Sequence, residues 1–296
     1  MNEHDRLVSR AARDAHTVLF IGGLESGKST LARATGAFAL HLGRTVAYLD
    51  ADVAQKTVGP PATVGLKHIH EPDDLTFERM ADADALGFVG STSPQGHLMP
   101  LVGAVARLRA RAHAEGADLV LVDTSGEVSG IWGQLVKYYE VDILEPDLVV
   151  GLQRGEELGP VLGVLERFFG ADVAPLTVHP GVTTSSVEQR MEQRQRSMAR
   201  YFGGELQRFR VKPTVFMPTL PPLFDLAELD RLLVGLSDGR GGFMGLGYLE
   251  YVREDQGLRL ISPVAEPPKA LRLGSVRLED NFRAKRVDLR NLFGTE

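Results

Sequence analysis

Residues 22–30 read Gly22-Gly23-Leu24-Glu25-Ser26-Gly27-Lys28-Ser29-Thr30, and the apolar run 17–21 leads directly into them. They fit the phosphate-loop pattern G-x-x-x-x-G-K-[ST]. A strand, a glycine-rich turn and a helix start aim backbone N–H groups and the positive end of the helix at one point, where polyphosphate binds. In this pattern Lys28 reaches the β- and γ-phosphates, and the Ser29 hydroxyl holds magnesium. The stretch predicts a nucleoside triphosphate site; the alternative is an ordinary glycine-rich turn.

The composition is that of a globular protein, with 43% apolar and 24% charged residues among 296. The chain has no apolar run long enough for a membrane span and no signal peptide at its start, so we expect a cytoplasmic protein without membrane contact. Without cysteine, metal chemistry rests on oxygen or histidine ligands, which suits magnesium. A net charge of −6 argues against a protein that coats long nucleic acid, so any basic substrate surface must be local.

Apolar strand-like runs alternate with helix-like runs through the first two hundred residues. Strands are expected at about 17–22, 45–50, 86–90, 118–123, 147–151 and 174–178, and helices at about 28–42, 97–114, 130–140, 156–169 and 185–202. This alternation predicts an α/β P-loop NTPase domain over 1–204, with a mostly parallel sheet covered by helices on both faces. After Gly204 short β-like pieces separated by turn residues predict a small β-rich domain over 205–296.

Carboxylates end two of the expected strands. Asp50 and Asp52 follow the second strand and lie two residues apart, so on an extended chain both face the same way, toward the γ-phosphate. One is a candidate magnesium ligand, and the other is a candidate base for an attacking hydroxyl. Asp123 ends the fourth strand in the pattern called Walker B, a contact to magnesium or its waters. The alternative for Asp50 and Asp52 is a solvated acidic strand end.

Arginines gather in the run 185–202, at Arg190, Arg194, Arg196 and Arg200. On a helix Arg190 and Arg194 stand one turn apart on the same face and can present paired guanidinium groups to phosphate oxygens. An arginine-bearing lid suits phosphoryl transfer, because charge accumulates on the transferred group and water must be kept out. The alternative is a solvated helix in which Glu188 and Glu192 pair with these arginines.

A few further residues give weaker indications of function. His68 and His70 are expected at the surface of a loop rather than in a metal site. Trp132, at an expected helix start, is read as a packing residue, with base stacking as the alternative. The three asparagines, Asn2, Asn281 and Asn291, exclude the N-K-x-D motif by which switch GTPases read guanine.

Taken in order, these segments resemble the polynucleotide 5′-hydroxyl kinase family, which includes the RNA kinase subunit of the eukaryotic mRNA cleavage machinery. The matching pieces are the phosphate loop 22–30, Asp50-Ala51-Asp52-Val53-Ala54-Gln55, the loop 59–65, Phe88-Val89-Gly90-Ser91-Thr92-Ser93-Pro94, Val122-Asp123-Thr124-Ser125-Gly126, the segment 146–154, the lid-like run 190–202 and the glycine-rich tail pieces. The resemblance covers nearly the whole chain.

The resemblance implies roles for individual residues. Lys28 and Ser29 handle phosphates and magnesium, Asp52 activates the 5′-hydroxyl, and Arg190 and Arg194 are lid arginines. The expected catalytic residues are Lys28, Asp52, Arg190 and Arg194; the substrate-binding residues are Gln55, Pro60, Pro61, Thr63, Thr92 and Arg196; and the metal ligands are Ser29, Asp50, Asp52 and Asp123. For the proline-containing loop 57–65, whose prolines fix its path, a structural turn is the alternative to lining a substrate channel. Two departures concern Ala54, where the family has glycine, and Glu127, where some relatives have a base-stacking tryptophan.

The sequence thus predicts a kinase that uses magnesium and ATP or GTP to phosphorylate the 5′-hydroxyl end of RNA or DNA. One alternative is an NTP-binding scaffold or switch that acts in RNA processing without kinase activity. Another is a partition- or maturation-type ATPase, although these often carry a lysine where this chain has Gly23. RNA or DNA preference, nucleotide donor, oligomeric state, pathway and protein partners stay open.

Overall fold

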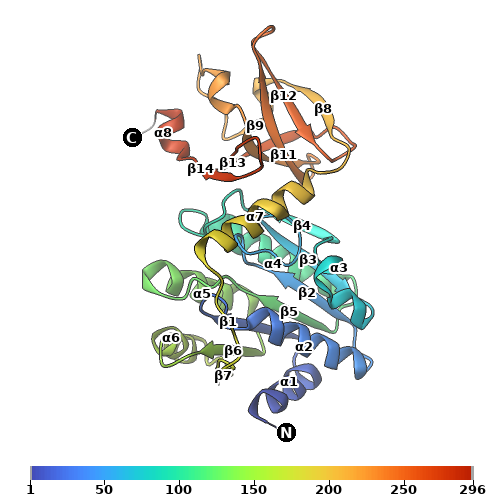
Figure 1. Cartoon of the computed structure of the whole chain (residues 1–296), viewed down its shortest axis with the longest axis vertical. Coiled ribbons are helices and arrows are strands. Elements are labelled where there is room, and N and C mark those ends of the chain that lie inside the picture. Colours follow the sequence, from blue (N-terminus) through green and yellow to red (C-terminus); the bar gives the residue numbers. More distant parts are fainter. Residues whose placement is uncertain (1, 295–296) are drawn as a thin grey trace.

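The computed structural model describes residues 2–294, in which two sheets lie one above the other along the long axis of the molecule (Figure 1). The first sheet comprises β1 (Thr17–Gly22), β2 (Val46–Asp50), β3 (Thr63–Ile69), β4 (Ala85–Phe88), β5 (Leu119–Asp123), β6 (Leu148–Gln153) and β7 (Val173–Thr177). Its order is β4-β3-β2-β5-β1-β6-β7. All of these strands run in one direction except β3, which is antiparallel to both of its neighbours. The predicted, mostly parallel sheet is therefore confirmed.

Strand β3 is the main element that sequence analysis missed, because its first residues were read as part of a proline-containing loop. The preceding loop folds back onto the strand, and Gly65 makes that approach possible. A Cβ atom at Gly65 would lie 2.3 Å from the Val58 carbonyl oxygen. His68 accordingly lies in a strand and not in a loop, where its Nε2 is 2.8 Å from Glu115 Oε2.

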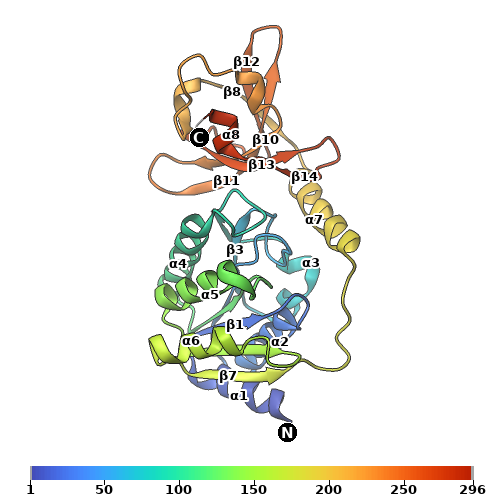
Figure 2. The ribbon, with the colours of Figure 1, turned by 90° about the vertical axis from the view of Figure 1, so that its left-hand side faces the viewer.

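Helices cover both faces of the first sheet, as predicted (Figures 1 and 2). On one face α4 (Leu98–Ala114), α5 (Gly130–Leu144) and α6 (Gly159–Phe169) share a buried core with the strands. On the other face lie α1 (Glu3–Asp14), which was not predicted, and α2 (Lys28–His41). Asn2 caps α1 by accepting a hydrogen bond from the Asp5 N–H. The short η1 (Pro72–Leu75) and α3 (Phe77–Met80) connect β3 to β4.

The second sheet begins at Gln207. It comprises β8 (Gln207–Val211), β9 (Phe216–Met217), β10 (Leu232–Ser237), β11 (Phe243–Val252), β12 (Gly257–Ser262), β13 (Ala270–Leu278) and β14 (Ala284–Arg286), with η2 (Pro213–Val215), η3 (Leu226–Leu229) and α8 (Leu289–Phe293) beside them. Apart from β9, which pairs in parallel with β13, the strands are antiparallel in the order β14-β13-β10-β11-β12-β8. The β-rich C-terminal domain expected from the sequence is present.

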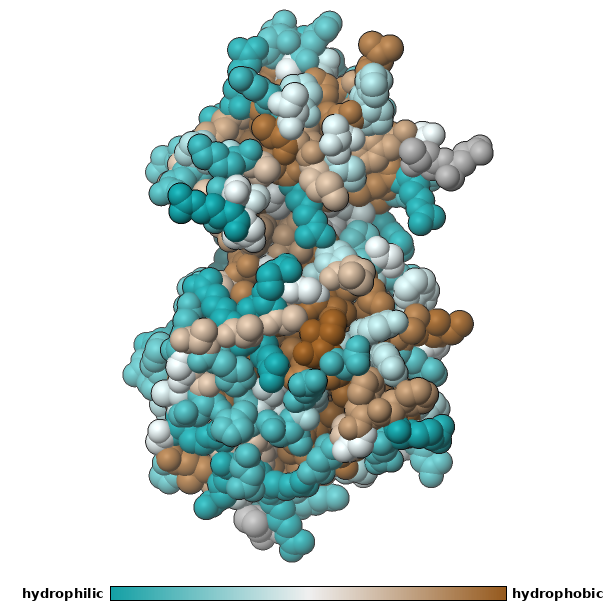
Figure 3. Space-filling view, turned by 180° about the vertical axis from the view of Figure 1, so that it is seen from behind, coloured by the Kyte–Doolittle hydropathy of each residue, from teal (hydrophilic) through white to brown (hydrophobic). Residues whose placement is uncertain are grey.

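Two regions join the sheets across the waist that the surface view shows (Figure 3). Helix α7 (Val187–Tyr201) runs along one side, and Phe202 at its end stacks on Phe282 with ring centroids 5.6 Å apart. Beside β4, the Ser275 N–H donates to the Gly90 carbonyl over 2.7 Å. A Cβ atom at Gly235 would lie 2.5 Å from Phe88 Cγ, so the two sheets pack tightly here. The domain division at residue 204 stays a prediction, because α7 packs against both parts.

Among residues 2–294, no helix is long and apolar enough to span a membrane.

Candidate active site

The phosphate loop closes tightly around its own lysine. Gly27 takes a φ of +92° at the N-cap of α2, a conformation that favours glycine. Lys28 Nζ donates to the carbonyl oxygens of Gly22 at 2.9 Å and Gly23 at 2.8 Å. Burial lowers the pKa of Lys28, while the nearby Asp123 and Asp52 act in the opposite direction. The lysine side chain is therefore folded back onto the first residues of its own loop.

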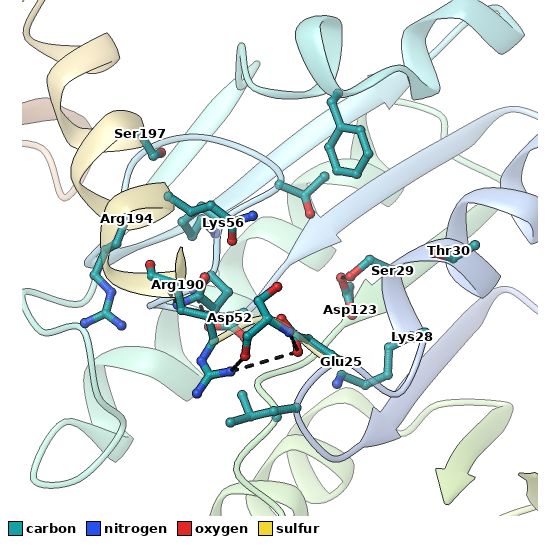
Figure 4. Close-up of a pocket in the computed structure, with 18 of the residues that line it drawn as sticks. Glu25, Lys28, Ser29, Thr30, Asp52, Lys56, Asp123, Arg190, Arg194 and Ser197 are labelled. Carbon is teal, nitrogen blue, oxygen red and sulfur yellow. Dashed lines mark hydrogen bonds and ion pairs between the residues drawn. The ribbon is translucent and has the colours of Figure 1, made fainter. Parts of the chain in front are cut away.

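A cavity of about 710 Å³ opens beside this loop (Figure 4). Its walls come from five separate parts of the chain: the phosphate loop with the start of α2, the segment after β2, the region of α3, the segment after β5, and the run that ends in α7. They contribute, among others, Leu24, Glu25, Ser26, Gly27, Lys28, Ser29, Thr30, Asp52, Gln55, Asp123, Thr124, Gly126, Arg190, Arg194 and Arg196. The fold thus brings most of the expected site residues to one pocket at the carboxyl ends of the strands.

Asp123 and Ser29 form the floor of this pocket. Ser29 Oγ donates to Asp123 Oδ2 over 2.5 Å, and the buried Tyr48 hydroxyl donates to the same oxygen over 2.7 Å. Asp123 Oδ1 is buried and has no hydrogen-bond partner among the described residues. Burial raises the pKa of Asp123, and Lys28 opposes the rise. One carboxylate oxygen is thus fixed by hydroxyls, and the other is left for a further partner.

Asp52 projects into the pocket from a turn just beyond β2. Its Oδ1 accepts the N–H groups of Ala54 at 2.8 Å and Gln55 at 2.9 Å. These bonds fix the direction of the side chain while leaving Oδ2 without a hydrogen-bond partner within residues 2–294. Gln55 Nε2 reaches the Arg190 carbonyl at 3.5 Å, which joins the turn to the lid helix.

The expectation that Asp50 is a metal ligand needs correction. Asp50 does not line the pocket; its carboxylate is buried and accepts the N–H groups of Asp52, Thr57 and Val58. Its Oδ1 lies 3.1 Å from Lys56 Nζ, and both side chains are almost completely inaccessible. Burial raises the pKa of Asp50 to about 6, although Lys56 opposes this. The chain leaves the extended conformation just after Asp50, so Asp52 lines the pocket while Asp50 does not, and Asp50 anchors the loop instead.

Helix α7 closes one side of the pocket with two arginines. Arg190 Nη1 donates to the Ser185 carbonyl over 2.6 Å and lies 3.9 Å from Glu25 Oε2 of the phosphate loop. Arg194 Nε is buried without a hydrogen-bond partner in the described chain, and burial lowers the pKa of its guanidinium group. Arg196 is 74% exposed and pairs with Glu192 over 3.0 Å. The solvated-helix alternative therefore describes Arg196 but neither Arg190 nor Arg194.

Four expected substrate-binding residues lie outside the pocket. Pro60, Pro61 and Thr63 are buried under the connection to β3, where Thr63 Oγ1 donates to the Pro60 carbonyl over 2.6 Å. The backbone N–H groups of Val89 and Gly90 donate to the Ala62 carbonyl, so this loop braces β4. Thr92 lies in the loop that faces the second sheet. Pro60 and Pro61 therefore support the loop before β3, Thr63 begins that strand, and none of the three lines the pocket.

Comparison with known proteins decides the family. Residues 22–204 match the family model described as mRNA cleavage and polyadenylation factor CLP1 P-loop, which is more than half of the chain. The chain belongs to the CLP1 P-loop family. The resemblance to polynucleotide 5′-hydroxyl kinases stated from the sequence is confirmed by this match and by the relatives below.

Several proteins similar to this CLP1 P-loop family member are named polyribonucleotide 5′-hydroxyl-kinases. A polyribonucleotide 5′-hydroxyl-kinase of Thermococcus kodakarensis is 28% identical over 319 residues, covering 89% of this chain and 88% of the relative. One of Pyrococcus horikoshii is 27% identical over 322 residues, covering 90% and 86%. The polyribonucleotide 5′-hydroxyl-kinase Clp1 of Rattus norvegicus is 27% identical over 197 residues, covering 63% of this chain and 45% of the relative.

A solved structure of the Clp1p–Pcf11p complex gives the same fold for Clp1p. Its chain superposes with a TM-score of 0.69 at 15% identity, over 93% of the present chain and 77% of that chain. At this identity the likeness shows the fold alone, and it covers both sheets of the present CLP1 P-loop family member.

Several residues at or beside the pocket were assigned no role from the sequence. Arg33 lies over the Phe77 ring, 4.3 Å from its centroid, and both line the cavity. Arg154, which follows β6 and lies in the matching segment 146–154, does not line the pocket, but it donates to the Glu25 carbonyl over 2.8 Å and supports the phosphate loop. The contacts themselves could not be predicted locally, because each joins parts of the chain that only the fold brings together. Trp132, expected to pack, is 43% exposed at the start of α5.

Proposed function

We propose that this chain transfers the γ-phosphate of a nucleoside triphosphate to the 5′-hydroxyl end of a polynucleotide. The observation that carries the proposal is a single pocket that holds a phosphate-loop lysine, a carboxylate with an available oxygen, and two lid arginines. Phosphoryl transfer depends on positioning and on stabilising charge, and these are the groups that supply both. Relatives that align over most of this chain are named polyribonucleotide 5′-hydroxyl-kinases, which makes RNA the first substrate to test.

Asp52 is the residue we assign to proton removal from the attacking hydroxyl. Its Oδ1 is held by two backbone N–H groups, so Oδ2 keeps a defined direction into the pocket. A carboxylate in this position accepts the proton as the hydroxyl oxygen forms its bond to phosphorus. Lys28, Arg190 and Arg194 surround the same space with positive charge, which stabilises the charge on the transferred group.

The floor of the pocket fits magnesium. Oxygen donors are the ligands that this ion prefers, and Asp123 Oδ1 is buried without a protein partner next to Ser29. Asp123 and Ser29 would hold the ion directly or through water, with Asp52 as a further carboxylate. Magnesium bound there would neutralise phosphate charge. No group of three or more His, Cys, Asp or Glu side chains suited to a metal occurs among residues 2–294.

The nucleotide donor is either ATP or GTP. The phosphate loop and the lid act on the phosphates that both nucleotides share. The pair Arg33 and Phe77 at the pocket wall is the candidate contact for the base, because an arginine and an aromatic ring can stack on any purine.

The direct test is transfer of the γ-phosphate from labelled ATP or GTP to 5′-hydroxyl RNA and DNA oligonucleotides in the presence of Mg²⁺. The matched controls are the same oligonucleotides with a 5′-phosphate and the Lys28→Ala protein, neither of which is expected to give labelled product. Release of free phosphate without labelled oligonucleotide would support an ATPase. Nucleotide binding with neither product would support the scaffold.

A further inference from the structure

Three arginines from both parts of the molecule gather on one side of the junction without acidic partners. Arg107 lies on α4, Arg272 on β13 and Arg286 on β14. None of them forms an ion pair with a carboxylate among residues 2–294, whereas many other arginines of the chain do. We call Arg107, Arg272 and Arg286 the junction arginines.

Their placement is fixed by the packing between the sheets. Arg272 lies over the Phe88 ring, 5.6 Å from its centroid, on the face of β13 that meets the first sheet. Arg286 is on β14 directly opposite Val276 of β13. Between them, Ser275 Oγ is 2.9 Å from His97 Nε2 at the start of α4. The N-terminal end of α4 lies below the second sheet in Figure 2.

The cluster is a local region of positive potential in a chain of net charge −6. Burial is the main cause that lowers the pKa of Arg272, and the charge of Arg107 lowers it further. For His97 burial again comes first among the causes that lower its pKa, with Arg286 and Arg272 adding to it. Neighbouring positive groups repel one another, and an anion bound between them would reduce this repulsion.

A chain of contacts links this cluster to the active-site pocket. Gly126 lines the pocket, and the next residue, Glu127, accepts a hydrogen bond from Gln95 Nε2 over 3.2 Å. The Gln95 carbonyl is 3.2 Å from His97 Nδ1, and His97 contacts β13 through Ser275. These contacts connect the rim of the pocket, past the Glu127 carboxylate, to the junction arginines. The lid arginines belong to α7 and lie on the pocket, so they are not part of this cluster.

We propose that the junction arginines bind backbone phosphates of the polynucleotide strand whose 5′ end occupies the pocket. This inference rests on the proposed function. Guanidinium groups without carboxylate partners bind phosphate oxygens through paired N–H donors, independently of base sequence. The ligand is a single strand several nucleotides long, because its first nucleotide must reach the pocket while later phosphates reach the junction.

The test compares phosphorylation of a 5′-hydroxyl RNA dinucleotide with that of an RNA of about 15 nucleotides, which is long enough to fill a typical single-strand site. The variants are Arg107→Gln, Arg286→Gln and the double variant, since both side chains are exposed and the changes leave the fold intact. Arg253→Gln is the matched control, because Arg253 is also exposed but lies in the turn between β11 and β12.

We expect the double variant to raise KM for the long RNA several-fold, with kcat and the dinucleotide KM unchanged. The slope of log(1/KM) against log salt should become shallower by about 0.7 for each phosphate that the double variant no longer neutralises. Arg253→Gln should change none of these. Equal KM values of wild type and double variant for the long RNA, or equal effects on both substrates, would overturn the inference.

A second measurement separates this inference from the proposed function. Fluorescence anisotropy of a labelled RNA of the same length reports binding without any phosphoryl transfer. If the wild type phosphorylates no oligonucleotide, the proposed function fails, and salt-sensitive binding that weakens in the double variant would still support the junction site. Wild-type phosphorylation together with unchanged binding in the double variant would reject the junction site alone.

Discussion

Arg190 of the lid helix and Glu25 of the phosphate loop face each other across the pocket, with Nη1 and Oε2 3.9 Å apart (Figure 4). Glu25 also accepts the backbone N–H of Ser185, at the start of the lid segment. The Glu25 carboxylate thus connects the segment leading into α7 to the phosphate loop. Both side chains are largely but not fully buried, at 20% and 24% exposed.

Replacing Arg190 tests the lid. We expect Arg190→Ala to lower kcat by about 10²- to 10³-fold, because a cation that stabilises the transferred group is removed, with a smaller change in nucleotide Kd. Arg253→Ala is the control, since Arg253 is exposed in the turn between β11 and β12, away from the pocket, and its turnover should stay close to wild type. If the two variants turn over at the same rate, Arg190 has no role in phosphoryl transfer, as the solvated-helix alternative states.

Replacing Glu25 tests the other partner of the same contact. In the proposed function its negative charge competes with the bound phosphates for Arg190. We expect Glu25→Gln to lower the nucleotide KM by about fivefold, since one unit charge about 4 Å away is worth about 1 kcal/mol in water. The substitution keeps the side chain's length. Steady-state kinetics with varied ATP measure the effect, and a nucleotide KM that rises would show that Glu25 supports phosphate binding instead.

Asp52 carries the chemical step in the proposed mechanism. Asp52→Asn keeps an oxygen to accept the N–H groups of Ala54 and Gln55, so the turn should persist. Removal of the proton acceptor is expected to lower kcat by about 10²- to 10⁴-fold while nucleotide binding is retained. Single-turnover phosphorylation of an oligonucleotide is the measurement. Wild-type turnover in this variant would remove Asp52 from the role of base.

The fold and the central residues of the site could be predicted from local sequence patterns, whereas the contacts that join distant parts of the chain could not. The phosphate loop, Asp123 and Arg190 each carry a signal within a few residues, and parallel strands bring such signals to one edge. Asp50 shows where a prediction from local sequence fails. Side chains two residues apart point to the same side only while the chain stays extended. Here the chain turns immediately after Asp50, and the Asp52 N–H donates back to the Asp50 carboxylate. Lys56, its partner, gives no sign of being buried, because a lysine in a loop is normally solvated.

The pair formed by Asp50 and Lys56 should be important for stability. Asp50→Asn leaves the buried ammonium group of Lys56 without a counter-charge, and we expect a loss of about 3 to 5 kcal/mol in the free energy of unfolding. Denaturant unfolding measures this. Asp172→Asn is the control, because Asp172 pairs with Arg10 at the surface and should cost about 1 kcal/mol or less. A small effect at Asp50 would mean that water reaches Lys56.

A second buried ion pair lies under the segment that follows β5. Lys137 and Glu140 of α5 are both inaccessible, with Nζ and Oε2 3.0 Å apart, and Lys137 Nζ also reaches Ser125 Oγ at 3.4 Å. Glu140 Oε1 has no partner among the described residues, and burial raises the pKa of Glu140. Lys137→Met alone should therefore destabilise the protein by about 3 to 5 kcal/mol, since an unpaired carboxylate stays buried.

The double variant Lys137→Met, Glu140→Leu tests whether the ion pair only fills the core or also positions the segment after β5. Apolar side chains of similar size remove both desolvation costs, so its stability should equal or exceed that of wild type by about 1 to 4 kcal/mol. If the pair serves only packing, phosphorylation by this stable variant stays at the wild-type level. A lower kcat in a stable double variant would instead show that the bond to Ser125 positions the segment containing Thr124 and Gly126, which lines the pocket.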